Sequence, residues 1–339
     1  MAYENEREPA AGQAPTGGVR YVEAGEGDDG QRLDNFLVRH LKGVPRTHVY
    51  RLLRKGEVRV NSKRARADQR VATGDRIRIP PVRQAEPTAA GARPPSRSLI
   101  ERVLGSIVYE DDDILVLNKP AGIAVHGGSG MSHGVIEVLR AARPEATELD
   151  LVHRLDRETS GCLIVAKRRA ALRNLHAQLR EGTTEKLYLA LLCGKWNLGH
   201  KRIELALDTG ERRGGERHVA VRGHGKAAVS TFRPVQFFGN VATLVEVAID
   251  TGKTHQIRVH AAYAGHPVAG DDKYGDREKN EALRQYGLNR MFLHAASIGV
   301  ERPGTHEPLN VSAPLGEDLG AVLDALLKAP GSRRGARRR

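Results

Sequence analysis

The sequence predicts a two-domain protein of the α+β class, in which a small basic N-terminal domain precedes a body built on a mixed, largely antiparallel β-sheet. Three observations support this prediction. The chain has 339 residues, which is more than one average domain. A proline-containing stretch without hydrophobic periodicity divides it at residues 84–98. Beyond that stretch, strand-like runs outnumber helical ones.

The N-terminal domain, residues 21–83, is predicted to contain two short helices and two short strands. Apolar residues recur at helical spacing over 31–41 and again over 45–55, where Gly56 ends the pattern. Alternating runs at 58–61 and 75–79 indicate the strands. The outward positions are basic, and the candidates for binding a polyanion are Arg46, Arg51, Arg54, Lys55, Arg59, Lys63 and Arg64.

The positive charge of the chain is concentrated in two segments. Residues 31–83 hold 15 Lys or Arg against 4 Asp or Glu, whereas the whole chain carries a net charge of +13. The last nine residues add +5 and the first thirty contribute −5, which leaves the body almost neutral. A basic module beside a neutral body is typical of a protein that binds nucleic acid. A membrane surface is a poorer partner, because the basic segments have no large apolar face.

The two ends of the chain and the stretch between the domains are predicted to lack regular structure. Residues 1–20 form an acidic disordered leader, residues 84–98 a linker and residues 330–339 a basic disordered tail. No apolar run reaches the roughly 20 residues of a membrane-spanning helix. The two cysteines, Cys162 and Cys193, lie in apolar runs without metal-ligand spacing. They favour buried free thiols and a reducing, cytoplasmic compartment.

The body, residues 99–329, is predicted to contain more strands than helices. Strand-like runs lie at 107–109, 114–117, 149–152, 162–166, 186–192, 228–232 and 243–249. Helical patterns lie at 135–142, 168–181, 254–264 and 319–327. Residues 208–226, rich in Gly, Arg and His, are expected to form a mobile hairpin or loop within the sheet.

Four segments of the body place polar or charged residues beside strands or turn-forming residues. Residues 149–161 run from a strand into the sequence His-Arg-Leu-Asp-Arg-Glu-Thr-Ser-Gly. The other segments are Asn-Lys-Pro-Ala-Gly at 118–122, Glu-Lys-Leu-Tyr at 185–188, and Thr-Gly-Lys-Thr-His-Gln-Ile-Arg-Val-His at 251–260. The last opens a helix that Thr254 is expected to cap. A charged turn alone is more often a solvated loop, so the interpretation depends on the four segments together.

In this order, the segments resemble the signature of the pseudouridine synthases of the RluA branch, over roughly residues 107–300. One departure is Lys253, where that family more often has Arg. Residues 31–79 resemble the S4-type RNA-binding domain. The resemblance implies the α+β fold of those enzymes and an isomerase that converts specific uridines of large-subunit (23S) ribosomal RNA to pseudouridine. It implies no cofactor and no metal.

The resemblance also implies roles for individual residues. Asp156 would be the catalytic carboxylate, acting as nucleophile or as base, a choice that the sequence leaves open. Arg258 would pair with it, Tyr188 would lie against the extruded uracil, and Arg154 would fill the space that the flipped nucleotide leaves. Lys186, which precedes Tyr188 in the same strand, is assigned to the same site.

These residues also have structural interpretations. Tyr188 could pack the core, and Arg258 could be a cation on a helix surface. A metal site at His255 and His260 is unfavourable, because residues five positions apart on a helix lie on different faces. Ser160 lacks the Gly-x-Ser-x-Gly elbow that exposes a nucleophilic serine, so its expected role is in the turn.

Two other functions are alternatives at this level. A non-catalytic RNA-binding or ribosome-assembly factor would use the same basic domain, but binding alone does not need the His-Arg-Leu-Asp and Thr-His-Gln-Ile-Arg sequences. A nucleoside hydrolase would share the carboxylate but would not need the S4-type domain. Nothing in the sequence demands more than a monomer.

Overall fold

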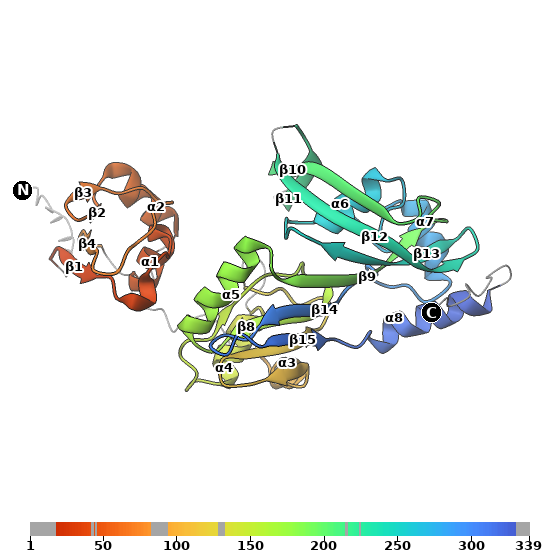
Figure 1. Cartoon of the computed structure of the whole chain (residues 1–339), viewed down its shortest axis with the longest axis horizontal. Helices are drawn as coiled ribbons and strands as arrows, with labels where there is room; N and C mark the ends of the chain where they lie inside the picture. The colour runs from red at the N-terminus through yellow and green to blue at the C-terminus, as the bar shows by residue number, and fades with distance from the viewer. Residues whose placement is uncertain are drawn as a thin grey trace, which may run out of the picture. The chain divides into compact units, whose positions relative to one another are not determined.

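A computed structural model divides the chain into two compact units, residues 1–92 and 93–339 (Figure 1). It describes residues 18–41, 44, 46–82, 94–127, 133–213, 216–223 and 225–329, without the side chains of residues 26, 46, 209–213, 216 and 217. Most of the predicted leader and linker, and the whole predicted tail at 330–339, lie outside the described residues. Within the described ranges, no helix is both long enough and apolar enough to cross a membrane.

The N-terminal unit packs two helices against a four-stranded antiparallel sheet. Phe36 and Leu37 of the first helix and Val49 of the second share a core with Ile77 of the sheet. Both predicted helices and both predicted strands are present, with two further short strands, and the sheet order is β1-β4-β2-β3. The elements are β1 (Arg20–Glu23), a 3-10 turn (Glu26–Asp28), α1 (Leu33–His40), α2 (Arg46–Lys55), β2 (Arg59–Val60), β3 (Lys63–Arg64) and β4 (Arg76–Ile79).

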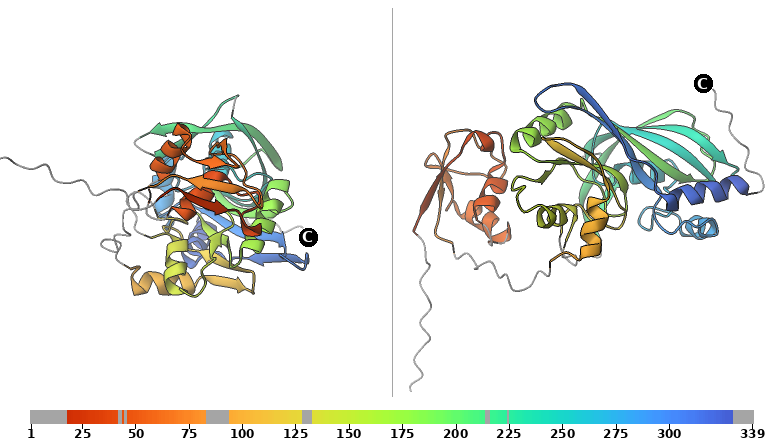
Figure 2. Two further views of the ribbon diagram at one scale, coloured as in Figure 1. Left: turned by 90° about the vertical axis from the view of Figure 1, so that its left-hand side faces the viewer. Right: turned by 90° about the horizontal axis from the view of Figure 1, so that it is seen from below.

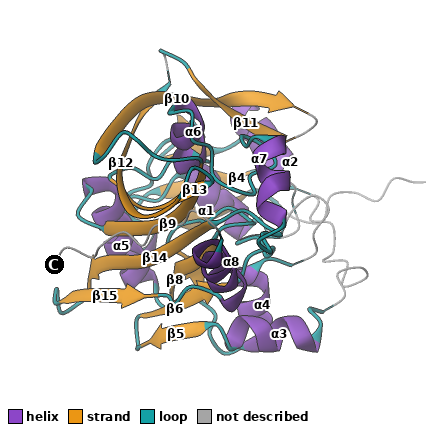
Figure 3. Ribbon diagram, turned by 90° about the vertical axis from the view of Figure 1, so that its right-hand side faces the viewer, coloured by secondary structure: helices purple, strands orange, loops and turns teal. Residues whose placement is uncertain are grey.

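The second unit is built on an eleven-stranded mixed sheet with the path β11-β10-β12-β13-β9-β14-β8-β6-β5. Figure 3 shows this succession from β10 to β5. Each pair is antiparallel except β14 with β8. The predicted α+β class with a largely antiparallel sheet is confirmed. The strands are β5 (Ile107–Glu110), β6 (Ile114–Lys119), β7 (Asp150–Leu151), β8 (Ser160–Ala166), β9 (Glu185–Cys193), β10 (Lys201–Arg213), β11 (Glu216–Val221), β12 (Lys226–Phe238), β13 (Ala242–Ile249), β14 (Leu293–Glu301) and β15 (Pro308–Ser312).

The helices of this unit include four that the periodicity predicts and two that it does not. The predicted ones are α4 (Val135–Ala142), α5 (Arg169–Glu181), α6 (Gln256–Tyr263) and α8 (Glu317–Lys328). The additional ones are α3 (Arg97–Leu104) and α7 (Arg277–Arg284). Helix α6 packs against β10, β11 and β12, and this end of the sheet curves over it (Figures 2 and 3).

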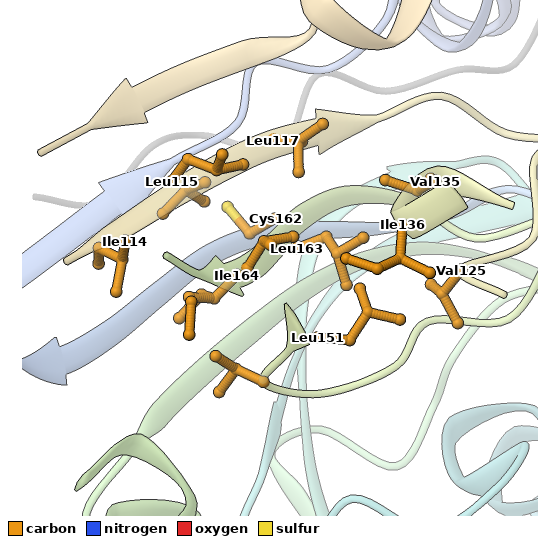
Figure 4. Close-up of a cluster of buried hydrophobic side chains, with 14 of the residues drawn as sticks. Ile114, Leu115, Leu117, Val125, Val135, Ile136, Leu151, Cys162, Leu163 and Ile164 are labelled. Atoms are coloured by element: carbon orange, nitrogen blue, oxygen red, sulfur yellow. The ribbon is translucent and has the colours of Figure 1, made fainter. Parts of the chain in front are cut away.

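The main core lies beside the charged turn that the sequence singles out. Strands β6 and β8 are buried along almost their whole length, and they pack with α4 through Leu115, Leu163 and Ile136 (Figure 4). Cys162 belongs to this core, and both cysteines are free and buried, as predicted. Because β8 is buried along its whole length, the turn between β7 and β8 ends on a rigid support.

A close approach of two backbones fixes where this turn leaves the sheet. β14 and β8 pair in parallel, with Ala295 opposite Gly161. Gly161 has φ +108°, and a Cβ atom there would lie 2.2 Å from the carbonyl oxygen of Ala295. Only glycine allows this contact. The Gly of the His-Arg-Leu-Asp-Arg-Glu-Thr-Ser-Gly sequence is therefore required by the sheet, and Ser160 is the first residue of β8 rather than part of the turn.

The stretch 208–226, expected as a mobile hairpin or loop, is largely a strand hairpin. β10 continues to residue 213 and returns as β11, paired antiparallel from Leu207 with Val221 to Arg213 with Glu216. Its polar composition disguised the strands, because β11 is at the edge of the sheet and its backbone pairing with β10 does not require a continuous apolar pattern.

Candidate active site

A pocket of about 520 Å³, its open mouth included, lies where the turn before β8 faces the start of α6. Four of the five predicted active-site residues line it: Arg154, Asp156, Tyr188 and Arg258. They come from three elements that are far apart in the sequence, namely the turn, β9 and α6. Lys186 is not among the lining residues. The remaining walls include Leu155, Thr159, Ile249, His255, Ile257 and Leu293.

Asp156 and Arg258 form an ion pair inside this pocket. Nη1 of Arg258 lies 3.3 Å from Oδ2 of Asp156, and the two side chains are 11% and 18% exposed, respectively. The backbone N–H of Thr159 donates to the carbonyl of Asp156 over 3.1 Å, which closes the turn that carries the carboxylate. A carboxylate on a short closed turn beside a buried guanidinium has few alternative orientations.

Arg258 makes its shorter contacts to a residue that the sequence did not single out. Its Nε and Nη2 donate to the two carboxylate oxygens of Asp271 over 2.7 and 2.8 Å, and the Asp271 side chain is 0% exposed. Although burial opposes ionisation, these hydrogen bonds hold the pKa of Asp271 below its ordinary value. Burial also opposes the charge of Arg258, yet Asp271 and then Asp156 raise the pKa of the guanidinium. Asp271 therefore fixes the arginine that contacts Asp156.

Tyr188 and Lys186 lie on β9, two residues apart and so on the same face of the strand. Tyr188 is half-buried and forms part of the pocket wall. Burial, and secondarily the charge of Asp156, raise the pKa of its phenol. Lys186 is also half-buried, and burial lowers the pKa of its ammonium. Its charge acts together with burial on His153, whose pKa falls to about 4.

His153 and Arg154 begin the turn and have opposite environments. His153 is neutral near pH 7, and its Nε2 accepts the backbone N–H of Ile164 over 3.1 Å, which ties the turn to β8. Arg154 is exposed and contributes to the pocket wall. Of these two adjacent residues, His153 anchors the turn and Arg154 presents a cation to the pocket.

The start of α6 differs from the prediction. Thr254 is not the cap: the N-cap residue is His255, in the left-handed region with φ +54°, and its side chain does not cap the helix. The Oε1 atom of Gln256 instead accepts the backbone N–H of Lys253 over 3.1 Å and the hydroxyl of Thr251 over 2.7 Å. These bonds tie the first residue of α6 to the loop that precedes it, and Thr254 is not the cap because it lies one residue before the N-cap position.

His255 turns toward the Asp156–Arg258 pair. Its Nε2 lies 3.7 Å from Oδ2 of Asp156, and its Nδ1 lies 2.8 Å from the hydroxyl of Tyr274. Burial lowers the pKa of His255 to about 4. The described residues contain no group of three or more His, Cys, Asp or Glu side chains arranged to hold a metal ion.

Lys119 of the Asn-Lys-Pro-Ala-Gly segment is a further residue whose role the sequence did not reveal. Its Nζ donates to the carbonyls of Pro120, Ile123 and Arg157 over 2.8, 2.9 and 3.1 Å. The side chain is fully buried, and burial lowers its pKa to about 7. The backbone N–H of Gly122 also donates to Arg157, over 2.9 Å. Through these bonds to the carbonyl of Arg157, this segment anchors the turn that carries Asp156.

The N-terminal unit presents most of the predicted RNA-binding residues at its surface. Arg51, Arg54 and Lys55 of α2 are exposed, as are Arg59, Lys63 and Arg64 around β2 and β3. The guanidinium of Arg64 donates to the carbonyl of Arg54 over 2.6 Å, so the loop and the helix are held together. Arg46 begins α2, but its side chain lies outside the described residues.

Two solved structures share this fold. The human protein titled RNA Pseudouridylate Synthase Domain Containing 4 superposes with a TM-score of 0.57, covering 68% of this chain and 95% of its own at 23% identity. Human RNA Pseudouridylate Synthase Domain Containing 1 gives 0.52, covering 67% and 96% at 27% identity. The family model described as RNA pseudouridylate synthase matches residues 113–263, and the S4 domain model matches residues 31–77.

Relatives about half identical over more than nine tenths of the chain are also pseudouridine synthases, and the chain belongs to this family of RNA-modifying isomerases. The family predicted from the four segments is therefore confirmed. Two of these relatives are both named Ribosomal large subunit pseudouridine synthase C. The one from Escherichia coli (strain K12) is 51% identical over 93% of this chain and 98% of its own length. The one from Haemophilus influenzae is 50% identical over 91% and 95%.

Proposed function

We propose that this pseudouridine synthase modifies specific uridines of large-subunit (23S) ribosomal RNA, with Asp156 as its catalytic carboxylate. The observation that carries the residue assignment is the Asp156–Arg258–Asp271 arrangement at the wall of the pocket. The RNA target is supported by the names of the half-identical relatives and by the S4 domain. We further propose that the protein acts on ribosomal RNA in the cytoplasm, and that it acts as a monomer.

The reaction needs one carboxylate and no change in oxidation state. The bond from the uracil nitrogen to the ribose carbon breaks, and a bond from the uracil C5 to the same ribose carbon forms. C5 loses a proton and the nitrogen gains one, so the product is an isomer. Asp156 can serve either by attacking covalently or by removing a ribose proton. Both routes use its carboxylate form, for which the guanidinium of Arg258, 3.3 Å from Oδ2, is placed as the counter-ion.

The other pocket residues suit a base that has left its helix. A flipped uracil loses its stacking partners, and the half-buried ring of Tyr188 in the pocket wall offers a replacement surface. Arg154, exposed beside Asp156, is proposed to enter the space that the nucleotide vacates. Lys186 is proposed to support the site indirectly, because it helps to keep His153 neutral and bound to β8.

Product analysis distinguishes this function from its two alternatives. The full-length protein is incubated with a large-subunit ribosomal RNA transcript, and the nucleosides are then separated and identified. Pseudouridine is the expected product, whereas unchanged RNA would indicate a binding factor and free uracil a hydrolase. Mapping pseudouridines in ribosomal RNA from cells with and without the gene would identify the target positions. If the same positions were modified in both, the proposed target would be wrong.

The basic N-terminal unit is expected to supply most of the phosphate contacts. A variant beginning near Arg97, at the start of α3, should bind a ribosomal RNA fragment more weakly and with a flatter salt dependence. Each lost phosphate contact removes about 0.7–0.9 from the slope of log K against log salt. Binding across a salt series measures this slope. At low salt the shortened protein should still form pseudouridine slowly, with a raised KM.

Two comparisons control this experiment. Removing only residues 333–339 should change the slope less, because this segment holds 5 arginines whereas residues 31–83 hold 15 Lys or Arg. In the full-length chain, Arg59→Gln with Lys63→Gln should flatten the slope, whereas Arg277→Gln with Lys328→Gln, at exposed positions of the second unit, should not. Equal slopes for the full-length and shortened proteins would assign the RNA contacts to the second unit.

A further inference from the structure

We propose that His255 and Tyr274 form a positioning pair that presents a neutral N–H donor to Oδ2 of Asp156 and leaves Oδ1 as the reactive oxygen. Nε2 of His255 and Nη1 of Arg258 both approach Oδ2, at 3.7 and 3.3 Å. Among the described residues, no side-chain or backbone donor contacts Oδ1. This inference rests on the proposed catalytic role of Asp156.

The hydrogen bonds around Tyr274 determine which nitrogen of His255 carries the proton. The Tyr274 oxygen accepts the backbone N–H of Val219 over 2.9 Å and lies 2.8 Å from Nδ1 of His255. Burial raises the pKa of Tyr274, so the phenol keeps its proton. Within the described part of the chain, Nδ1 is the acceptor available to that proton. Tyr274 therefore donates to Nδ1, and the proton of the neutral imidazole is on Nε2.

The opposite tautomer would be unfavourable on both sides of the ring. A proton on Nδ1 would point at the Tyr274 oxygen and leave the phenol proton without an acceptor in the described surroundings. It would also turn the lone pair of Nε2 toward the carboxylate oxygen 3.7 Å away. An imidazolium is disfavoured by burial and by the positive charges of Arg258 and Lys273, although Asp156 and Asp271 favour it.

The backbone conformation of His255 is strained, which supports a role for the orientation of its imidazole. His255 is a non-glycine residue at φ +54°, in the left-handed region, which is unfavourable for a residue with a Cβ atom. The strain gives no capping contact in return, because the His255 side chain does not bond the first turn of α6. What the conformation achieves is to place the imidazole between Tyr274 and Asp156.

The tautomer can be observed directly in the full-length protein without RNA. Nitrogen NMR of ¹⁵N-histidine-labelled protein near pH 7 should show a signal from an imidazole with a protonated Nε2 and a hydrogen-bonded Nδ1 that is missing from His255→Gln. His294, whose Nε2 faces the carbonyl of Ala313 and whose Nδ1 faces the hydroxyl of Ser160, should give a second signal of this kind that His255→Gln retains. A protonated Nδ1, or an imidazolium, would overturn the inference. Because this measurement needs no turnover, it stands or fails independently of the proposed function.

Turnover then tests whether the pair acts on Asp156. His255→Phe should lower kcat by about tenfold to a hundredfold with KM for RNA little changed, because the lost donor matters to the reaction more than to binding. His255→Gln, whose amide N–H can occupy the place of Nε2–H, should recover most of that loss. His306→Phe is the matched control, since His306 is another left-handed histidine, with φ +59°, in the turn between β14 and β15. It should leave kcat unchanged.

A double-mutant cycle separates positioning from packing. Tyr274→Phe keeps the ring that lies 5.1 Å from the Arg258 guanidinium but removes the hydroxyl. It should lower kcat less than His255→Phe does, and the double variant should be no slower than His255→Phe alone. Additive losses, or a His255→Phe enzyme with wild-type kcat, would overturn the proposal.

Discussion

Asp156→Asn is expected to abolish pseudouridine formation while the protein still folds and binds RNA. The amide has the shape of the carboxylate but can act neither as nucleophile nor as base. The neighbouring Arg258 keeps both of its hydrogen bonds to Asp271, so the pocket should survive the change. Turnover should fall by a factor of at least about a thousand, which corresponds to roughly 4 kcal/mol of activation free energy. Single-turnover assays on a ribosomal RNA fragment measure it.

The matched control for Asp156→Asn is Glu158→Gln, two residues further along the same turn. Glu158 is exposed, and among the described residues its one ion pair is with the neighbouring Arg157, over 3.3 Å. This substitution also removes one carboxylate charge, so it reports the effect of charge without the proposed chemistry, and turnover should stay close to that of the wild type. Substantial turnover by Asp156→Asn, with melting temperature and RNA affinity unchanged, would assign the reaction to a different group.

The parts of the fold that the sequence predicted are those in which burial is visible in the residue pattern. β6 and β8 are nearly continuous apolar runs, and α4 and α5 have a clear apolar stripe. β14 escaped prediction because its Ala, Ser and Gly residues have no alternation, and its strand conformation comes from pairing with β8, β9 and β15. Helix α7 buries only Leu283 among eight residues, so it has almost no periodicity.

The residues of the candidate site were predictable where they belong to a motif and unpredictable where they depend on a tertiary contact. Arg154, Asp156, Tyr188 and Arg258, assigned by resemblance, meet in one pocket. Asp271 was not assigned, because its contact with Arg258 depends on how the chain after α6 returns to the site. The sequence did contain one signal for Lys119, because it is a lone lysine at the end of an apolar run. Such a position indicates a buried lysine, and a buried lysine needs several hydrogen-bond acceptors.

Arg258→Met is expected to destabilise the protein and to damage catalysis for two separate reasons. Asp271, whose side chain is fully buried, would lose its partner, and leaving one member of a buried ion pair alone costs about 3–5 kcal/mol. Asp156 would lose its guanidinium as well, so turnover should fall strongly. Urea unfolding and single-turnover kinetics measure the two losses separately.

The pH dependence identifies the buried carboxylate as the source of the stability loss. In the wild type the pKa of Asp271 is lowered, so its contribution is present above the unfolded-state pKa of about 3.9 and is lost as pH falls through the folded value. In Arg258→Met, burial acts unopposed by the arginine and should raise that pKa. The unfolding free energy of the variant is then reduced at neutral pH, where Asp271 is ionised without its partner. The reduction becomes smaller as the pH falls and Asp271 is protonated. The difference in unfolding free energy should therefore be largest near pH 7 and narrow below about pH 4.

The double variant Arg258→Met with Asp271→Asn distinguishes the two roles of the arginine. Without the charge of Asp271 there is no unpaired buried carboxylate at that position, so much of the stability should return, and its pH dependence should flatten. Turnover should stay low, because Asp156 still lacks the guanidinium that approaches its Oδ2 at 3.3 Å. Recovery of turnover together with stability would mean that Arg258 serves the fold alone.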